Sequence, residues 1–140
     1  WDQIASAAII DDLMRAKQQI GEYNYNTANL MCFVNLRDHR SIVNYLAGRG
    51  AQFPSIGEDM ANNGRAGKLA GIQLVVSNSV AASKALIVVP QICATWKEAV
   101  PLTATTIVDE YKGVKIRACE IGVTQVTDPK AIVVITGTQQ

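Results

Sequence analysis

The first twenty residues carry the hydrophobic period of an amphipathic helix. Their apolar positions are spaced by three or four residues: Ile4, Ala8, Ile9, Leu13, Ala16 and Ile20. Charged residues fall between them: Asp11, Asp12, Arg15 and Lys17. This pattern predicts a helix from about Asp2 to Gln19 with one buried face. Gly21 is well placed to end that helix in the left-handed conformation.

A short apolar run and a second helical pattern follow. Leu30–Val34 predicts a buried strand. Asn35 then resembles a helix N-cap, with Asp38 near the positive end of the helix dipole. The predicted helix buries three apolar side chains and ends at Gly48. Those side chains are Ile42, Val43 and Leu46.

The pattern changes between Gly48 and Gly71, where six glycines punctuate a stretch that has few large apolar residues. A loop of this length in a compact domain is usually functional or mobile. Four elements are expected after it. They are a strand at Ile72–Val76, a strand at Ala85–Val89, a short helix from Gln91 to Lys97 begun by Pro90, and a strand with one apolar face at Val100–Val108.

The last forty residues predict a long, half-exposed strand at Lys112–Val123 and a short, buried one at Ala131–Gly137, separated by the break Thr127–Lys130. The long strand changes parity. Its apolar residues are first even-numbered and then odd-numbered: Val114, Ile116, Ala118, Ile121 and Val123. Such a change would move the apolar side to the other face unless an extra residue is absorbed. We therefore expect a β-bulge between Cys119 and Gly122, and a bend of the ribbon there.

Composition limits the classes of protein that fit. A chain of 140 residues with 49% hydrophobic residues is long enough for one sizeable core, so a single soluble globular domain is expected. A net charge of +1 gives no electrostatic footprint for specific nucleic-acid binding. No apolar run has the length of a membrane span, and no signal peptide opens the chain. Since the first residue is Trp1, we expect a processed product or a fragment.

The three cysteines, Cys32, Cys93 and Cys119, are widely spaced and contain no C-x-x-C pair. This spacing gives almost no support to a metal site or a redox motif. Each cysteine lies in an apolar context, so the simpler interpretation is a small buried hydrophobic residue.

Other candidate chemistry is equally sparse. The segment Gly64–Leu69 resembles a phosphate-binding loop, but it lacks the first glycine and the hydroxyl residue of that motif, so a flexible basic loop is the better interpretation. His39 and Asp38 are adjacent on a helix and therefore do not face each other, which favours a charged surface face over an acid–base pair. The adjacent Asp11 and Asp12 favour a solvated helix edge. No serine lies in a G-x-S-x-G elbow. The sequence therefore predicts no enzyme activity, no cofactor and no metal.

Taken together, the segments from Ile4 to Gly137 resemble the C-terminal portion of tailed-phage-type major capsid proteins, which have the Hong Kong 97-like fold also used by encapsulin shells. Cys32–Ile42 is similar to the pattern xxNPxDxxxI, with Leu36 in place of the frequent proline. Gly71–Ser79 is similar to the start of GxPVVxSxxxxxG, with Gln73 where proline is common. A strand and short helix ending at Trp96 follow in the same order, and then the closing strands.

The resemblance implies an α+β fold: the axial domain of a capsid subunit, with a central mixed sheet flanked by helices and a long β-ribbon near the C-terminus. Residues 1–99 would form the core of the axial domain. Residues 100–140 would close it and partly return toward the peripheral domain. The implied function is that of a structural subunit of an icosahedral viral or prophage capsid, located in the virion capsid and, before assembly, in the host cytoplasm.

The implied partner is the protein itself, in pentamers and hexamers of the full-length parent. This chain lacks the N-terminal arm, extended loop and spine helix of full-length relatives, so we expect it alone to be monomeric or weakly oligomeric. The 48–71 loop is the candidate contact region, with four exposed side chains: Arg49, Phe53, Arg65 and Lys68.

Two alternatives remain. One is an encapsulin-type cargo shell protein. The other is a small-molecule-binding α/β domain that uses the 48–71 loop as a lid, which would need a concave pocket with converging polar groups.

Overall fold

The computed structural model describes residues 1–2, 8–48, 67–109 and 113–139. These residues form two compact units: residues 1–93 together with 128–140, and residues 94–127. We call them the core unit and the ribbon. The fold is mixed α+β, as predicted.

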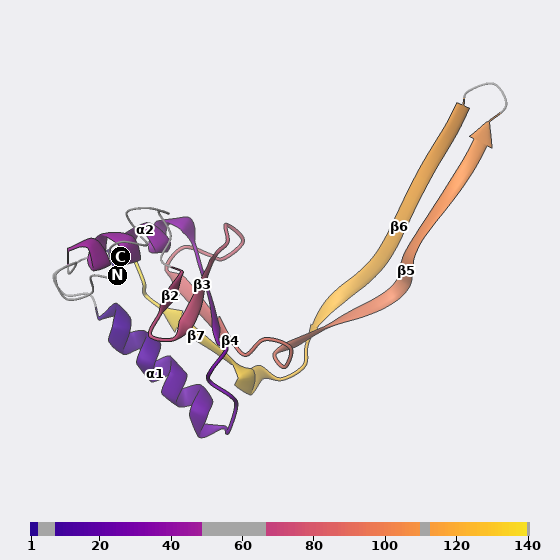
Figure 1. The fold of residues 1–140 in the computed structure, drawn as a ribbon. Coiled ribbons are helices and arrows are strands. Elements are labelled where there is room, and N and C mark those ends of the chain that lie inside the picture. Colours follow the sequence, from indigo (N-terminus) through magenta and orange to yellow (C-terminus); the bar gives the residue numbers. More distant parts are fainter. Residues whose placement is uncertain (3–7, 49–66, 110–112, 140) are drawn as a thin grey trace. The chain divides into compact units, whose positions relative to one another are not determined.

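The core unit is built on a five-stranded mixed sheet in the order β2-β3-β1-β4-β7 (Figure 1). Its strands are β1 (Met31–Val34), β2 (Lys68–Leu69), β3 (Ile72–Val76), β4 (Lys84–Val88) and β7 (Ile132–Thr136). The central strand β1 runs parallel to β3 and antiparallel to β4. Strand β7, from the end of the chain, pairs antiparallel with β4 at one edge of the sheet.

Helix α1 (Ile9–Glu22) packs near β7 and buries one face. The buried side chains are Ile9, Leu13, Ala16 and Ile20, which the hydrophobic period predicted. The expected residues 3–7 of this helix lie outside the described residues. The predicted end at Gly21 is wrong, because Gly21 lies within the last turn and the left-handed conformation is adopted by Asn24, with φ of 61°. Asparagine tolerates this conformation, so no glycine is needed there.

Helix α2 (Leu36–Ala47) confirms the expected cap. The Oδ1 atom of Asn35 accepts a hydrogen bond from the backbone N–H of Arg37 at 3.1 Å. The Asn35 side-chain amide also donates to the carbonyl of Val80 at 2.8 Å, which ties the start of the helix to the turn before β4. The helix ends at Gly48, as predicted. Of the three apolar residues expected to be buried, Ile42 and Leu46 are buried and Val43 is half-buried.

Two expectations for the sheet need correction. No helix forms over Gln91–Lys97: residues 91–93 make a turn, with φ of 69° at Gln91, and a strand begins at Ala94. Cross-strand pairing of Trp96 and Lys97 overrides the local helix signal.

The last strand, expected to be buried, is the partly exposed edge strand β7, in which Val134 is 52% exposed. An edge position leaves one side of an apolar strand uncovered.

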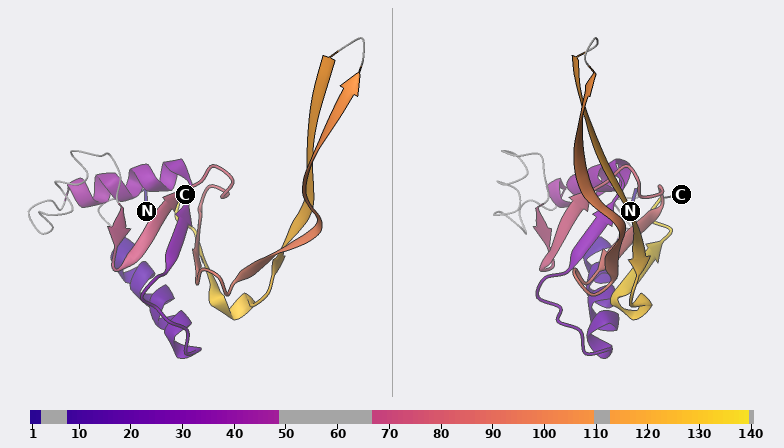
Figure 2. Two further views of the ribbon diagram at one scale, coloured as in Figure 1. Left: turned by 45° about the vertical axis from the view of Figure 1, so that its right-hand side comes forward. Right: turned by 90° about the vertical axis from the view of Figure 1, so that its right-hand side faces the viewer.

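The ribbon consists of two long antiparallel strands, β5 (Ala94–Asp109) and β6 (Gly113–Val126). In the two views of Figure 2 the strands curve together and cross, which reflects the strong twist of an isolated pair. A 3-10 turn, η1 (Pro129–Ala131), follows within the core unit and leads into β7.

Candidate interaction surface

The ribbon exposes more large apolar side chains than any other part of the chain that the structure describes. None of the residues of β6 is buried. The exposed large apolar residues of the ribbon are Trp96, Leu102, Ile107, Val108, Val114, Ile116, Ile121, Val123 and Val126. Of these, Ile116 is 76% exposed and Val108 is 70% exposed. Exposed apolar side chains in this number are typical of a surface that takes part in an interaction.

The pairing register places most of the exposed apolar residues of β6 in two patches on opposite faces. In the outer half of the ribbon, Val108 pairs with Val114 and Thr106 pairs with Ile116, so these side chains share one face. We call this the outer patch. In the inner half, Val100 pairs with Ile121 and Lys97 pairs with Val123, so Val100, Ile121 and Val123 share the other face. We call this the inner patch.

The predicted irregularity lies where the two patches meet, but on the other strand. Gly122 pairs with Glu98, Ile121 with Val100, and Cys119 with Thr103. Strand β5 therefore has one extra residue between Glu98 and Val100 and a second between Val100 and Thr103, whereas β6 has none. Since β6 contains no extra residue, its apolar side chains change from one face of the ribbon to the other at this point. Pro101 lies between Val100 and Thr103, the second irregular position, which suits a residue that cannot donate a backbone hydrogen bond to the neighbouring strand.

Trp96 and Gly122 determine the packing beside this irregularity. Trp96 pairs with Thr124, so Gly122 is its diagonal neighbour on the same face. A β-carbon placed on Gly122 would overlap the indole atoms Cζ2 and Cε2 of Trp96. Only glycine leaves room for the indole ring at this point.

The core unit holds the chain firmly where the ribbon leaves and returns. The backbone N–H of Asp128 donates to the carbonyl of Cys93 at 3.4 Å. The Asp128 carboxylate caps η1 by accepting from the N–H of Lys130 at 3.0 Å, and it also accepts a short hydrogen bond from the Tyr25 hydroxyl. This hydrogen bond raises the pKa of Tyr25. The Lys130 ammonium lies 5.2 Å from the centre of the Tyr23 ring, which adds a cation–π contact.

The predicted contact residues are only partly described. Arg49, Phe53 and Arg65 lie outside the described residues, as do residues 64–66 of the segment that resembles a phosphate-binding loop. Lys68 is exposed at the edge strand β2, where it pairs with Gln73. Of the four residues only Lys68 is therefore described, and their role as subunit contacts stays a prediction.

The prediction of a charged surface face at Asp38 and His39 is wrong. Asp38 is 0% exposed and His39 is 8% exposed. Their spacing from Ile42, Tyr45 and Leu46 puts them on the buried face of α2, since residues three, four and seven apart share one side of a helix. That spacing was present in the sequence, but their charge argued for the surface. Within the described residues no group of three or more potential metal ligands comes together.

The cysteines are free, and only one is fully buried. Cys32 lies at the centre of the sheet on β1, where burial and the nearby charge of Asp38 raise the pKa of its thiol to about 12. This confirms the prediction of a buried apolar cysteine at that position. Cys93 and Cys119 are half-buried.

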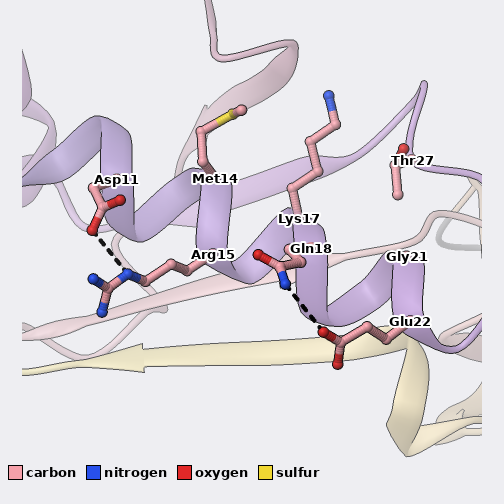
Figure 3. A pocket seen from close by; sticks show the side chains of 8 residues that line it. All are labelled: Asp11, Met14, Arg15, Lys17, Gln18, Gly21, Glu22 and Thr27. Carbon is pink, nitrogen blue, oxygen red and sulfur yellow. Dashed lines mark hydrogen bonds and ion pairs between the residues drawn. The ribbon is translucent and has the colours of Figure 1, made fainter.

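A shallow hollow lies along the outward side of α1 (Figure 3). Met14 and Lys17 extend over it from α1, with Thr27 across from them (Figure 3). The neighbouring polar side chains satisfy each other: Arg15 pairs with Asp11 at 2.8 Å, and Gln18 donates to Glu22 at 3.2 Å. The hollow therefore has no converging set of free polar groups of the kind that a ligand site needs.

None of the helices that the structure describes is both long and apolar enough to cross a membrane.

Comparison with solved structures decides the fold. The capsid structure of the cyanophage P-SCSP1u matches 95% of this chain with a TM-score of 0.71 and 16% sequence identity. The chain has a tailed-phage-type capsid protein fold. A structure from Mycobacterium phage Che8 matches 96% of the chain with a TM-score of 0.63 and 19% identity.

This capsid fold occupies only part of each matching structure. The chain spans about half the length of the two solved chains, covering 48% of the P-SCSP1u chain and 52% of the Che8 chain. No protein-family model and no curated protein sequence matches it. The likeness therefore rests on the arrangement of helices and strands, which the capsid fold preserves at low sequence identity.

Proposed function

We propose that this chain is part of a structural subunit of an icosahedral viral or prophage capsid, which acts by self-association into capsomers. The observation that carries this proposal is the match of nearly the whole chain to the P-SCSP1u capsid structure. The proposal includes the Hong Kong 97-like form of the fold, with residues 1–99 as the axial-domain core. It also includes a non-enzymatic role and a location in the virion capsid, after assembly in the host cytoplasm.

The exposed apolar ribbon supports this role. An isolated two-stranded ribbon is at best marginally stable in water, because it buries little apolar surface. The outer and inner patches therefore need a covering segment. In our proposal, residues 100–140 close the axial domain and partly return toward a peripheral domain supplied by the rest of the full-length subunit, which covers these patches in the assembled shell.

The test compares two substitutions at neighbouring positions of β6 in the full-length subunit. Ile116→Glu places a charge in the outer patch, whereas Lys115→Glu places the same charge on the opposite face. We expect Ile116→Glu to abolish or strongly reduce closed particles in electron micrographs and sedimentation profiles. Lys115→Glu should retain them. Circular dichroism of both variants checks that the core unit is folded.

Two outcomes contradict the proposal. If the unmodified full-length subunit forms no closed particles under any assembly condition that yields folded protein, the capsid function is wrong. If Ile116→Glu assembles with the yield of the unmodified subunit, the outer patch is not covered in the shell. No finding favours either the cargo-shell or the small-molecule-binding alternative.

A further inference from the structure

The two edges of the five-stranded sheet differ in how they are protected against pairing with another strand. At one edge, β2 has only two residues and exposes Lys68. A short strand that carries a lysine is a poor partner for a further strand. At the other edge, β7 lies beside β4 (Figure 1), and its five residues, Ile132–Thr136, include no charge and no proline. Its register against β4 is regular along the whole strand, so β7 is the unprotected edge.

Hydrogen bonds at the two ends of β7 show which of its backbone groups face outward. The N–H of Val89 donates to the carbonyl of Ala131 at 3.0 Å, and the N–H of Gly137 donates to the carbonyl of Ser83 at 2.9 Å. Hydrogen-bonded pairs alternate with unbonded pairs along an antiparallel ladder. The odd-numbered residues of β7 therefore direct their N–H and C=O groups toward β4, and the even-numbered residues direct theirs away from it.

The even-numbered residues of β7 are Ile132, Val134 and Thr136. The N–H of Ile132 already donates to the carbonyl of Pro129 in η1. The groups that remain are the carbonyls of all three residues and the N–H groups of Val134 and Thr136. None of these groups has a hydrogen-bond partner among the described residues. The outer edge of β7 thus offers both donors and acceptors to an extended segment.

These groups are complementary to those of a second copy of the same strand. When two copies run antiparallel about a two-fold axis at Val134, the Val134 N–H of each copy faces the Val134 carbonyl of the other. The Thr136 N–H of each copy then faces the Ile132 carbonyl of the other. This register aligns all five residues of both strands, and every free N–H of β7 has an acceptor.

Charge and side-chain burial also favour a second copy as the occupant. A residue on a two-fold axis meets its own copy, and like charges that face each other across two strands are destabilising. Strand β7 has no charge, whereas pairing through β2 would bring Lys68 close to its copy. Val133 and Ile135 already pack against the core, but Val134 is 52% exposed. Pairing at Val134 covers this exposed side chain with an identical one.

We propose that β7 pairs antiparallel with the β7 of a second copy of this chain, centred on Val134, so that the two five-stranded sheets join at their edges. A stable protein interface buries about 800 Å² per partner, and five residues of one edge strand cover less than this. The dimer is therefore weak and forms with rising protein concentration. As a two-fold contact it differs from the contacts that close a ring of five or six subunits, and it does not depend on the proposed capsid function.

Sedimentation equilibrium of the whole chain tests the pairing. We expect the apparent mass to rise from that of a monomer toward that of a dimer as the protein concentration increases. Val134→Lys places two ammonium groups across the two-fold axis and should weaken the dimer strongly. The matched control Val123→Lys adds the same charge at an exposed valine of the ribbon and should leave the dimer unchanged. Circular dichroism checks that both variants are folded.

Hydrogen exchange measured by NMR reports which amides take part. The amides of Val134 and Thr136 face outward in the monomer, so their exchange should slow several-fold when the protein concentration is raised. The amides of Val133 and Ile135 already bond to β4 and should be protected at low concentration as well. In Val134→Lys, the Thr136 amide should exchange at the same fast rate at both concentrations.

Three results overturn the pairing. One is a chain that remains monomeric up to its solubility limit. Another is a dimer that survives Val134→Lys but is lost in Val123→Lys, which would assign the contact to the ribbon. The third is a dimer in which the Val134 and Thr136 amides exchange as fast as in the monomer. This last result is obtained on the unmodified chain, so the test still decides if Val134→Lys fails to fold.

Discussion

The indole ring of Trp96 occupies the space that a side chain at Gly122 would need, across the two strands of the ribbon. Aromatic residues that cover a glycine on the neighbouring strand pin the register of a sheet. The contact lies beside the two extra residues of β5, where the regular pairing of the ribbon is interrupted.

Substitution of Gly122 tests this contact. We expect Gly122→Ala to destabilise the ribbon by about 1–3 kcal/mol, because the added methyl group overlaps the indole. Urea denaturation followed by tryptophan fluorescence measures the effect. Gly67→Ala is the matched control, since nothing lies within 4 Å of a β-carbon there. The double variant Gly122→Ala with Trp96→Leu should regain part of the stability that Gly122→Ala loses. If it regains none, the overlap with the indole is not the cause of the loss.

The cap of α2 gives a second prediction. Asn35→Ala removes the acceptor for the Arg37 N–H and the donor to the Val80 carbonyl, so the free energy of unfolding should fall by about 1–2 kcal/mol. Thermal denaturation followed by circular dichroism measures this loss. Asn35→Asp is the informative comparison, because it keeps the acceptor and loses the donor. A loss of equal size in both variants would assign the stabilisation to the Val80 contact alone.

Cys32 predicts a loss of stability at high pH. The pKa of its thiol is 9.0 when exposed and about 12 in the fold, so the folded state holds the proton more tightly than the unfolded chain. The contribution of this thiol is therefore fully present below pH 9 and is lost as the pH rises toward 12, by about 1.4 kcal/mol per pKa unit. The urea midpoint of unfolding should fall less steeply with pH between 9 and 12 in Cys32→Ala than in the unmodified chain. If the midpoint falls equally steeply in both, the raised pKa of Cys32 is contradicted.

Tyr25 gives a fourth prediction, which concerns titration of its hydroxyl group. The hydrogen bond to Asp128 raises the pKa of Tyr25 above 10.0, so its ionisation should come later than that of an exposed tyrosine. Ultraviolet difference spectra measure tyrosine ionisation, and Tyr25→Phe identifies the contribution of this residue. Asp128→Asn removes the charge of the acceptor and should bring the titration of Tyr25 back toward 10.0. An unchanged titration in Asp128→Asn would show that the hydrogen bond is not its cause.

Local signals in the sequence were sufficient for most of the core unit. The period of α1, the N-cap at Asn35 and the apolar runs of β3 and β4 each act through neighbouring residues, and the structure confirms them. The helix predicted over residues 91–97 failed for a non-local reason. This segment has a local helix signal, but residues 94–97 pair with residues of β6 about thirty positions later, and no short window of sequence contains that information.

The site was harder to predict than the fold. A long ribbon was predicted, but the exposure of its apolar side chains could not be recognised from sequence, because their alternating pattern is the same as that of a strand with one buried face. The burial of Asp38 and His39 was predictable in part, since both lie on the helix face of Ile42 and Leu46. Charge misled the interpretation there, because buried carboxylates are rare.

The two extra residues of β5 have a consequence for how the gene tolerates small deletions. One extra residue is Ala99, and the other lies at Pro101 or Leu102. The residues of β5 on both sides of these positions keep a regular partner on β6. Loss of the Ala99 codon would therefore remove one irregularity and leave the outer side chains of β5 opposite the same partners, on the same faces. Loss of a codon beyond Thr103, where each residue of β5 has its own partner, would shift the outer register by one residue and turn those side chains to the opposite face.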